Sequence, residues 1–292
     1  MDRWPTSPAR RALGGLVGLA ILAASSSAAE SSGGLVFSRR SQPVAERSLA
    51  VLQQRVGAGK VRVFDPYEGD EIVFDAFRFD QVLDFVYGRD WRSEEELLFT
   101  CSDGYQPTVP VARVLEHEAW LAFDRSGMDG FTLLKLESGS RQRIQLGPYY
   151  LVWENVEDEQ VRQQGDYGWP YQLVGVDLIR ARDRFPAMQP PVGASEDAVR
   201  GFAQFRMHCS RCHAINGDGG GIGPELNHPV NPTEVREHDW LVRWIDDPSQ
   251  ILPTARMPRL NPALPDRARV IDQLLAYLGA MAATGPPAES KP

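Results

Sequence analysis

The sequence predicts two domains, a strand-rich α+β domain followed by an all-α domain. Three observations support this fold class. Runs rich in β-branched and aromatic residues recur between residues 60 and 179, with Gly, Pro and Asp clustered between them. A proline-rich stretch, RFPAMQPPVGASED (184–197), interrupts this pattern, and the segments after it have the apolar spacing of helices.

The first domain is expected to span residues 30–186. The segments that predict strands are 60–64, 71–74, 97–101, 149–153 and 171–179. Apolar residues on one face predict two helices, residues 43–56 through Leu49, Leu52 and Val56, and residues 78–88 through Phe79, Val82 and Val86.

Residues 187–194 are expected to be a linker, residues 195–285 the second domain and residues 286–292 a flexible tail. Ser195 is a suitable N-cap for a helix that carries Val199, Phe202 and Phe205 to one side. A glycine-rich loop (216–224) follows, and further helices are predicted within 237–247 and 265–282.

The N-terminus predicts a signal peptide over residues 1–29. Arg10 and Arg11 precede an apolar run (12–24), and small residues near Ala29 offer a cleavage site. The run is shorter than the ~20 residues of a membrane span, and an uncleaved anchor is the alternative. We therefore expect an exported, periplasmic protein with no stable membrane span after cleavage.

The composition limits the classes of partner and the use of the cysteines. The 292 residues are 42% hydrophobic and carry a formal charge of −8, which suits a globular protein and makes nucleic acid an improbable partner. Three cysteines are too few for a disulfide-stapled secreted scaffold. The cysteines therefore need another explanation.

Two of the cysteines lie in CSRCH (209–213). Thiols three positions apart can each bond one vinyl group of a porphyrin, and His213 then lies where it can bind the iron. A zinc site would need further ligands, and no second Cys-x-x-Cys completes one. A redox dithiol should open a helix after a strand, whereas Cys209 and Cys212 follow a helix. Haem is therefore preferred over zinc and a dithiol.

A second axial ligand is available in ARMPRL (255–260), where Met257 offers a thioether that favours ferrous iron. The alternatives are that Met257 fills a gap in the core and that His228 binds the iron instead. Trp240 and Trp244 mark one helical face for either the haem pocket or the core. The remaining candidates have simpler interpretations: His208 and His238 as solvated side chains, Met207 and Met281 as packing residues.

Residues 195–285 resemble a class I cytochrome c. The resemblance is carried by Cys209, Cys212, His213, Pro224 in GIGPEL, Met257 in RMP, and Leu275, Tyr277 and Leu278 in the last helix. It implies one covalent haem c, with Pro224 and Tyr277 in its pocket and the Pro224 carbonyl accepting the free ring N–H of His213. It also implies that the first helix, near Phe202 and Phe205, crosses the last helix near Leu274 and Leu278.

The first domain resembles small sulfite-oxidase-like domains, related to the molybdopterin-binding domain of that enzyme. The matching stretches are 99–110, 146–153 and 167–179. In that family a cysteine thiolate ligates molybdenum, and Cys101 lies near the matching place. Surroundings that would bind a pyranopterin phosphate are not recognisable, so molybdopterin is not expected and Cys101 is interpreted as a buried free thiol. Asp103, Gly104 and Tyr105 are interpreted as a turn.

The expected function is single-electron transfer with transient redox partner proteins, because two protein ligands leave no open position on the iron. The N-terminal domain would dock a partner or bind a ligand, and the protein is not expected to be an enzyme. The alternatives are a redox enzyme whose N-terminal domain oxidises a small substrate and passes electrons to the haem, and a haem-based sensor or assembly factor.

Overall fold

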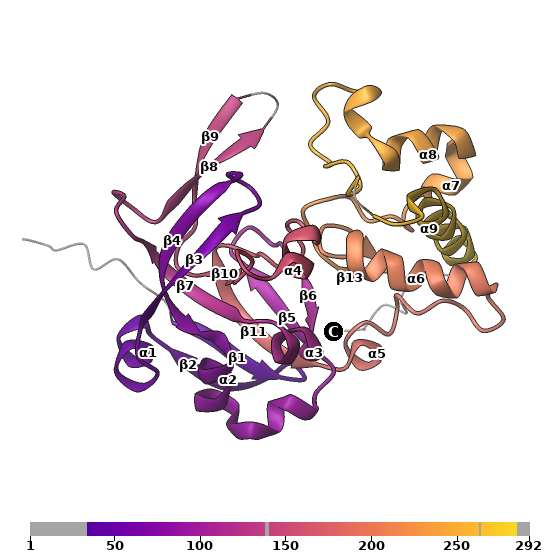
Figure 1. Ribbon diagram of the computed structural model, residues 1–292. Helices are drawn as coiled ribbons and strands as arrows, with labels where there is room; N and C mark the ends of the chain where they lie inside the picture. The colour runs from indigo at the N-terminus through magenta and orange to yellow at the C-terminus, as the bar shows by residue number, and fades with distance from the viewer. Residues whose placement is uncertain (1–33, 138–139, 263, 285–292) are drawn as a thin grey trace, which may run out of the picture. The chain divides into compact units, whose positions relative to one another are not determined.

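The computed structural model describes residues 34–137, 140–262 and 264–284. The predicted signal peptide and the predicted tail lie outside these ranges. In the described part a strand-rich region comes first and a helical region follows (Figure 1), which fits the two-domain prediction. No helix in this part is both long enough and apolar enough to span a membrane.

Two sheets and a separate hairpin form the strand-rich region (Figure 1). The five-stranded sheet has the order β2-β1-β11-β5-β6, in which β1 and β11 are parallel and the other pairs antiparallel. The four-stranded sheet has the antiparallel order β10-β7-β4-β3, and β8 pairs with β9. The strands are β1 (Leu35–Arg39), β2 (Gln42–Arg47), β3 (Gly59–Asp65), β4 (Asp70–Arg78), β5 (Glu96–Cys101), β6 (Thr108–Pro110), β7 (Ala119–Arg125), β8 (Thr132–Glu137), β9 (Ser140–Gln145), β10 (Tyr150–Trp153) and β11 (Leu173–Ile179).

All five segments predicted as strands are strands, namely β3, β4, β5, β10 and β11. The region also contains short helices: α1 (Leu49–Arg55), α2 (Phe79–Tyr87), the 3-10 helix η1 (Gly88–Ser93), α3 (Val111–Glu116), α4 (Glu159–Gln163) and α5 (Ala181–Arg184). The helix predicted over 43–56 is wrong in its first part. Residues 42–47 pair with β1 instead, and the helix starts after Ser48, whose side chain accepts from the Val51 N–H.

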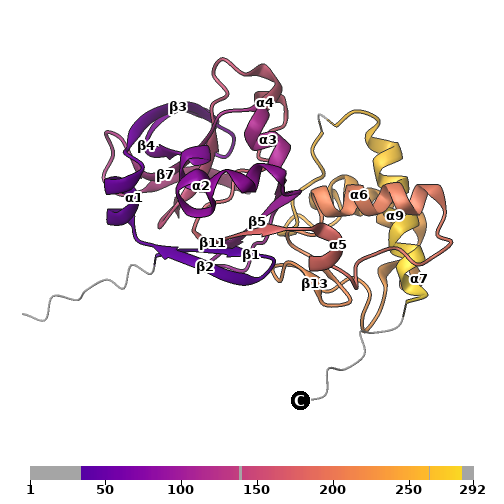
Figure 2. The ribbon, with the colours of Figure 1, turned by 90° about the horizontal axis from the view of Figure 1, so that it is seen from below.

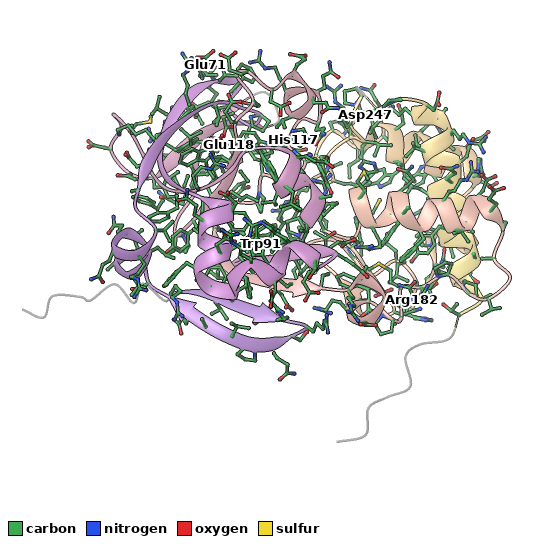
Figure 3. The ribbon with its side chains drawn as sticks, turned by 60° about the horizontal axis from the view of Figure 1, so that its bottom comes forward. Glu71, Trp91, His117, Glu118, Arg182 and Asp247 are labelled. Atoms are coloured by element: carbon green, nitrogen blue, oxygen red, sulfur yellow. The ribbon has the colours of Figure 1, made fainter. Side chains whose placement is uncertain are left out.

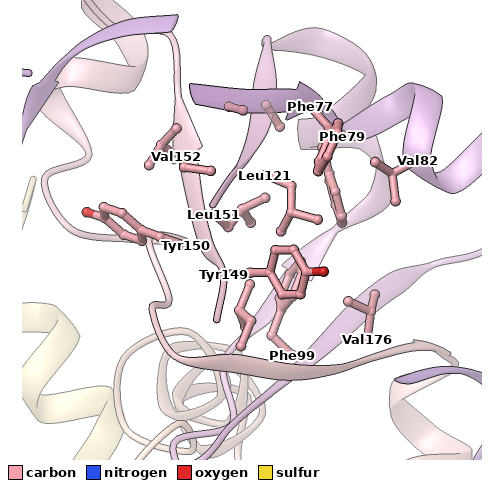
Figure 4. Close-up of a cluster of buried hydrophobic side chains, with 14 of the residues drawn as sticks. Phe77, Phe79, Val82, Phe99, Leu121, Tyr149, Tyr150, Leu151, Val152 and Val176 are labelled. Carbon is pink, nitrogen blue, oxygen red and sulfur yellow. The ribbon is translucent and has the colours of Figure 1, made fainter. Parts of the chain in front are cut away.

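The core of this region lies between the two sheets. Leu121 of β7 and Leu151 of β10 lie in one buried cluster with Phe99 of β5 and Val176 of β11 (Figure 4). The predicted apolar face of α2 joins the same cluster. Trp91 of η1, labelled in Figure 3, is fully buried. Its indole N–H donates to Asp84 at 2.8 Å.

The helical region is built on two crossing helices, α6 and α9, which lie side by side in both views (Figures 1 and 2). Ser195 caps α6 by accepting from the Ala198 N–H at 3.2 Å, as predicted. The elements of this region are α6 (Glu196–His208), β12 (Ala214–Ile215), β13 (Asp218–Gly219), α7 (Pro232–Val235), α8 (His238–Asp246), the 3-10 helix η2 (Pro248–Gln250) and α9 (Arg267–Ala282).

The crossing of α6 and α9 is close because Gly201 has no side chain. A Cβ atom there would lie 2.6 Å from the carbonyl carbon of Gln273 and 2.8 Å from the Cβ of Tyr277. The rings of Phe202 and Phe205 pack on Tyr277, with centroids 5.6 and 5.2 Å away. The predicted crossing of the first and last helices is therefore confirmed.

Two details of the helical region differ from the predictions. Val199 is 51% exposed, because the face of α6 that turns inward carries Ala198, Gly201 and Phe205. The region is also not entirely helical, since β12 and β13 form a short hairpin directly after His213. Its turn is Asn216-Gly217, with both residues at positive φ (54° and 85°), the combination that favours this tight turn.

The helical region makes contacts with the segment that precedes α6. The Tyr277 hydroxyl donates to the Met188 carbonyl (2.6 Å), and Met188 is buried. The first residues of the predicted linker are therefore fixed in place. Leu98 of β5 and Ile179 of β11 belong to the same buried cluster as the α6–α9 crossing, so the strand-rich and helical regions share apolar contacts.

Candidate haem-binding site

The attachment segment begins where α6 ends. The N–H of Cys209 donates to the Phe205 carbonyl (2.8 Å) and completes the last helical turn. The N–H groups of Cys212 and His213 then both donate to the carbonyl of residue 209, at 3.0 and 2.9 Å. These bonds hold the two cysteines and the histidine in one tight turn, and both thiols are free.

The surroundings of the two thiols do not suit the competing interpretations. Burial raises the pKa of Cys209 to about 12, and burial also raises the pKa of Cys212. Redox-active dithiols have a lowered thiol pKa. Across the described ranges, no group of three or more His, Cys, Asp or Glu side chains is placed to hold a metal ion, so a four-ligand zinc site has no structural basis there.

His213 is oriented by the glycine-rich loop. Its Nδ1 lies 2.8 Å from the Pro224 carbonyl oxygen. Since a carbonyl can only accept, Nδ1 carries the proton and Nε2 is the nitrogen with a free lone pair. This predicted hydrogen bond is present, and it fixes both the tautomer and the direction of the imidazole, as outer partners of ligating histidines do.

Gly223 packs directly against the imidazole ring of His213. A Cβ at this position would lie 2.6 Å from the Nδ1 and 2.8 Å from the Nε2 of His213. The backbone therefore approaches the ring as closely as a glycine permits. The Gly223 N–H also donates to the Cys212 carbonyl (2.7 Å), which connects the loop directly to the attachment segment.

The carboxylate of Glu225 holds the loop in this position. It accepts hydrogen bonds from the backbone N–H groups of Asn216, Gly217 and Asn227, at 2.9, 3.0 and 2.9 Å. These donors belong to the hairpin turn and to the chain beyond the loop. One carboxylate thus joins both sides of the segment that presents the Pro224 carbonyl.

Buried asparagine side chains form a hydrogen-bond network behind the loop. The Nδ2 of Asn227 donates to the Oδ1 of Asn216 (2.7 Å), and the Nδ2 of Asn231 donates to the Oδ1 of Asn227 (2.9 Å). The same Asn231 amide reaches the Leu278 carbonyl (2.8 Å), and that of Asn216 reaches the Thr284 hydroxyl (3.1 Å). Because buried amides need such partners, this network ties the hairpin and loop to the end of α9.

Met257 lies half-buried in the irregular segment between η2 and α9. Arg267 fixes that segment, because its guanidinium donates to the Leu260 carbonyl (2.8 Å) and pairs with Asp246 of α8. These bonds fix the segment at Leu260, three residues after Met257. Met257 as the sixth ligand stays a prediction.

The other histidines are placed as follows. The Nε2 of His228 lies 3.3 Å from the Asn227 amide nitrogen, and His228 as the rival of Met257 stays an untested alternative. His238 is exposed beside Asp239. The solvated interpretation of His208 is wrong: its Nε2 is buried and has no hydrogen-bond partner among the described residues, and burial lowers its pKa to about 4.

Three aromatic residues were predicted at the haem pocket. Trp240 and Trp244 stack on each other on α8, with centroids 5.1 Å apart and nearly parallel planes, and both are half-buried. Tyr277 lies fully buried at the α6–α9 crossing. Their contact with haem remains a prediction. Of the two methionines predicted to pack, Met281 is buried, but Met207 is 45% exposed.

Cys101 belongs to the interior of the strand-rich region. Cys101 is a free thiol with 3% exposure, and burial raises its pKa, so the predicted buried thiol is confirmed. The predicted turn is also present, since Asp103 accepts from the Tyr105 N–H (2.9 Å) and Gly104 has φ 89°.

Sequence reasoning missed four residues of the site. Gly223 contacts the His213 ring, and Glu225 holds the loop. Arg211 lies within the attachment segment and contacts Tyr105, and Gly201 sets the helix crossing. Gly223 directly precedes Pro224, and this adjacency is a local sequence signal that could have identified Gly223 as a residue of the site. Arg211 and Glu225 gave no such signal, because their partners lie far along the chain or on backbone groups.

The residues present fit covalent haem: two free thiols in one turn, and an imidazole whose Nε2 is left for the iron by the Pro224 bond. Residues 198–279 match the family model described as Cytochrome c. This part of the chain is a cytochrome c domain, and it indicates haem-based electron transfer. The match does not extend to the strand-rich region, and the sulfite-oxidase-like resemblance gains no support from it. No curated protein matches the chain.

Proposed function

We propose that the chain is an exported electron carrier that holds one haem c through Cys209 and Cys212, with His213 and Met257 as axial ligands. The observation that carries the proposal is the His213–Pro224 hydrogen bond directly behind two free thiols, within the segment that matches the family model. When bound, the haem supplies a one-electron ferric–ferrous couple.

The protein residues around the site would have separate roles. The thiols of Cys209 and Cys212 would hold the porphyrin, and His213, oriented by the Pro224 carbonyl, would ligate the iron through Nε2. Met257, on a segment that Arg267 contacts, would supply a thioether as the second protein ligand. With both positions taken by side chains, substrate has no place on the iron, and outer-sphere transfer is the function these residues support best.

Replacing Met257 with alanine tests the sixth ligand. We expect the ferric protein to lose the weak near-infrared absorption band of a sulfur–iron bond, and its midpoint potential to fall because a soft thioether favours ferrous iron. Met207→Ala is the matched control, since Met207 is exposed on α6 and its removal should leave the band in place. A band that survives Met257→Ala would assign the sixth position to another residue.

Replacing both Cys209 and Cys212 with alanine tests covalent attachment. We expect acidic acetone to extract the haem completely from this variant and not from the unsubstituted protein, because the two thioether bonds are absent. The control is Cys101→Ala, which removes the buried thiol of the strand-rich region. Haem that resists extraction without Cys209 and Cys212 would contradict the assignment.

The strand-rich domain is proposed to dock a redox partner or bind a ligand, without a cofactor of its own. The competing proposal is an oxidoreductase in which this domain oxidises a small substrate with molybdopterin. Metal analysis of the purified full chain separates the two. One iron and no molybdenum per chain supports the carrier, whereas stoichiometric molybdenum would establish the enzyme.

Export to the periplasm belongs to the same proposal. It is supported by the composition of residues 1–29, where two arginines precede a short apolar run and a small-residue cleavage site. Covalent attachment of haem to a Cys-x-x-Cys-His segment takes place outside the cytoplasm, which is consistent with that leader.

A further inference from the structure

The strand-rich region contacts the haem-attachment segment at Arg211, the residue between the two cysteines. The backbone N–H of Gln106 donates to the Arg211 carbonyl (3.1 Å), and the Nη1 of Arg211 donates to the Tyr105 hydroxyl (3.2 Å). The Nε of the same guanidinium donates to the His208 carbonyl (3.3 Å). Three hydrogen bonds therefore fix the side chain and the backbone of this one residue.

The turn that holds Arg211 is itself well fixed. Asp103 accepts from the Tyr105 N–H (2.9 Å), and the N–H of Cys101, at the end of β5, donates to the Tyr105 carbonyl (3.0 Å). The Tyr105 ring packs against the core of the strand-rich region. The phenol is thus a rigid acceptor presented by the first domain to the attachment segment of the second.

The charge of Arg211 is only partly compensated. In the described part of the chain its guanidinium bonds to a phenol and a carbonyl and forms no ion pair, while Asp166 acts on it from beyond ion-pair distance. Burial raises the pKa of Tyr105 to about 12, so the phenol stays neutral and does not cancel the charge. By contrast Arg206, also at this interface, is directly paired with Glu96.

We propose that Arg211, positioned by Tyr105, raises the reduction potential of the haem and is the point at which the strand-rich domain controls it. Ferric haem carries one more positive charge than ferrous haem, so a fixed cation beside the attachment segment disfavours the ferric form. Arg211 is half-buried, so this interaction is stronger than that between charges in bulk water, because the effective dielectric constant is lower. This inference rests on the proposed function, since it requires haem at Cys209 and Cys212.

The test is the midpoint potential of the full haem-loaded chain, measured by spectroelectrochemical titration for substitutions at this interface. Arg211→Gln is expected to lower the equilibrium constant for reduction about tenfold, which is 59 mV for one electron. Arg211→Lys, which keeps the charge, should recover most of that loss. The double substitution Arg206→Gln/Glu96→Gln is the matched control and should change the potential much less, because it removes both charges of an ion pair and leaves the net charge unchanged.

Two further variants separate an electrostatic role from a merely structural one. Asp166→Asn should shift the potential in the opposite direction, upward, because it removes a negative charge that acts on Arg211. Tyr105→Phe should lower the potential by less than Arg211→Gln, and it should have no further effect when Arg211 is already glutamine. That non-additivity would show that Tyr105 acts through Arg211.

The outcomes distinguish this inference from the proposal on which it rests. Haem-loaded Arg211→Gln with an unchanged potential overturns the inference and leaves the electron carrier intact. An equal loss in Arg211→Gln and Arg211→Lys also overturns it, because the charge would then be irrelevant. A wild-type chain without covalent haem would overturn both.

Discussion

Replacing Gly201 with alanine is expected to destabilise the helical region by about 3 kcal/mol or more, the upper range for overpacking a close contact. The new methyl group would overlap the backbone of Gln273 and approach the Cβ of Tyr277 to 2.8 Å. A helix backbone cannot move aside like a flexible side chain, so α6 and α9 must separate. Guanidinium denaturation followed by circular dichroism measures the loss as a lower transition midpoint.

Gly279→Ala is the matched control, because Gly279 is also a helical glycine. The atom nearest to the methyl group that this substitution would add is the Thr233 hydroxyl oxygen, at 4.0 Å. With room for the methyl group, alanine should be neutral or stabilise α9 by up to about 1 kcal/mol, through its better helix propensity. If Gly201→Ala unfolds at the same midpoint as Gly279→Ala, the close crossing of α6 and α9 is wrong.

Replacing Gly223 with alanine is expected to displace the His213 imidazole while leaving both thioether bonds intact. The methyl group would lie 2.6 Å from Nδ1 and 2.8 Å from Nε2, on the face of the ring. Overpacking of about 2 kcal/mol corresponds to roughly a thirtyfold change in the ligation equilibrium. The measurement is the low-spin to high-spin change in the visible spectrum of the ferric protein.

Gly221→Ala provides the control within the same loop. No atom lies within 4 Å of the methyl group at this position, and the residue is not in the left-handed region of φ. The spectrum should therefore match that of the unsubstituted chain. A low-spin spectrum retained by Gly223→Ala would show that the loop can retreat from the ring, and that the close approach does not orient His213.

Local chemistry made part of this molecule predictable. Ser195 is a strong N-cap because its hydroxyl accepts a free N–H of the first turn, and that signal needs no knowledge of the rest of the chain. The CSRCH segment and Pro224 are similar, since the spacing of the ligating groups carries their chemistry. The five predicted strands have compositions that indicate strands before any partner is known.

Features that depend on distant partners were not predictable. Residues 43–47 were included in the predicted helix but belong to β2, because β1 offers an antiparallel partner that no local sequence pattern indicates. Val199 was assigned to the inner face of α6, yet Gly201 is the residue that α9 approaches. His208 was interpreted as solvated because its neighbours in the sequence do not indicate burial. Its burial arises from packing in the folded chain.

The candidate site also contains both residues that could be predicted from the sequence and residues that could not. The attachment residues are specified by spacing, whereas the support of the loop comes from backbone-to-side-chain bonds that any acidic or amide residue could have made. Glu225 and Asn227 look like ordinary loop residues in the sequence. Their roles appear only when the hairpin, the loop and the end of α9 are brought together.

The buried amide network bears on the order in which this protein reaches its final form. Asn231 bonds to the Leu278 carbonyl and Asn216 to the Thr284 hydroxyl, and both partners leave the ribosome long after the cysteines do. The nascent chain thus exposes its attachment segment before the loop behind it can be locked. The network that holds the loop can therefore be complete only after the C-terminal residues have folded against it.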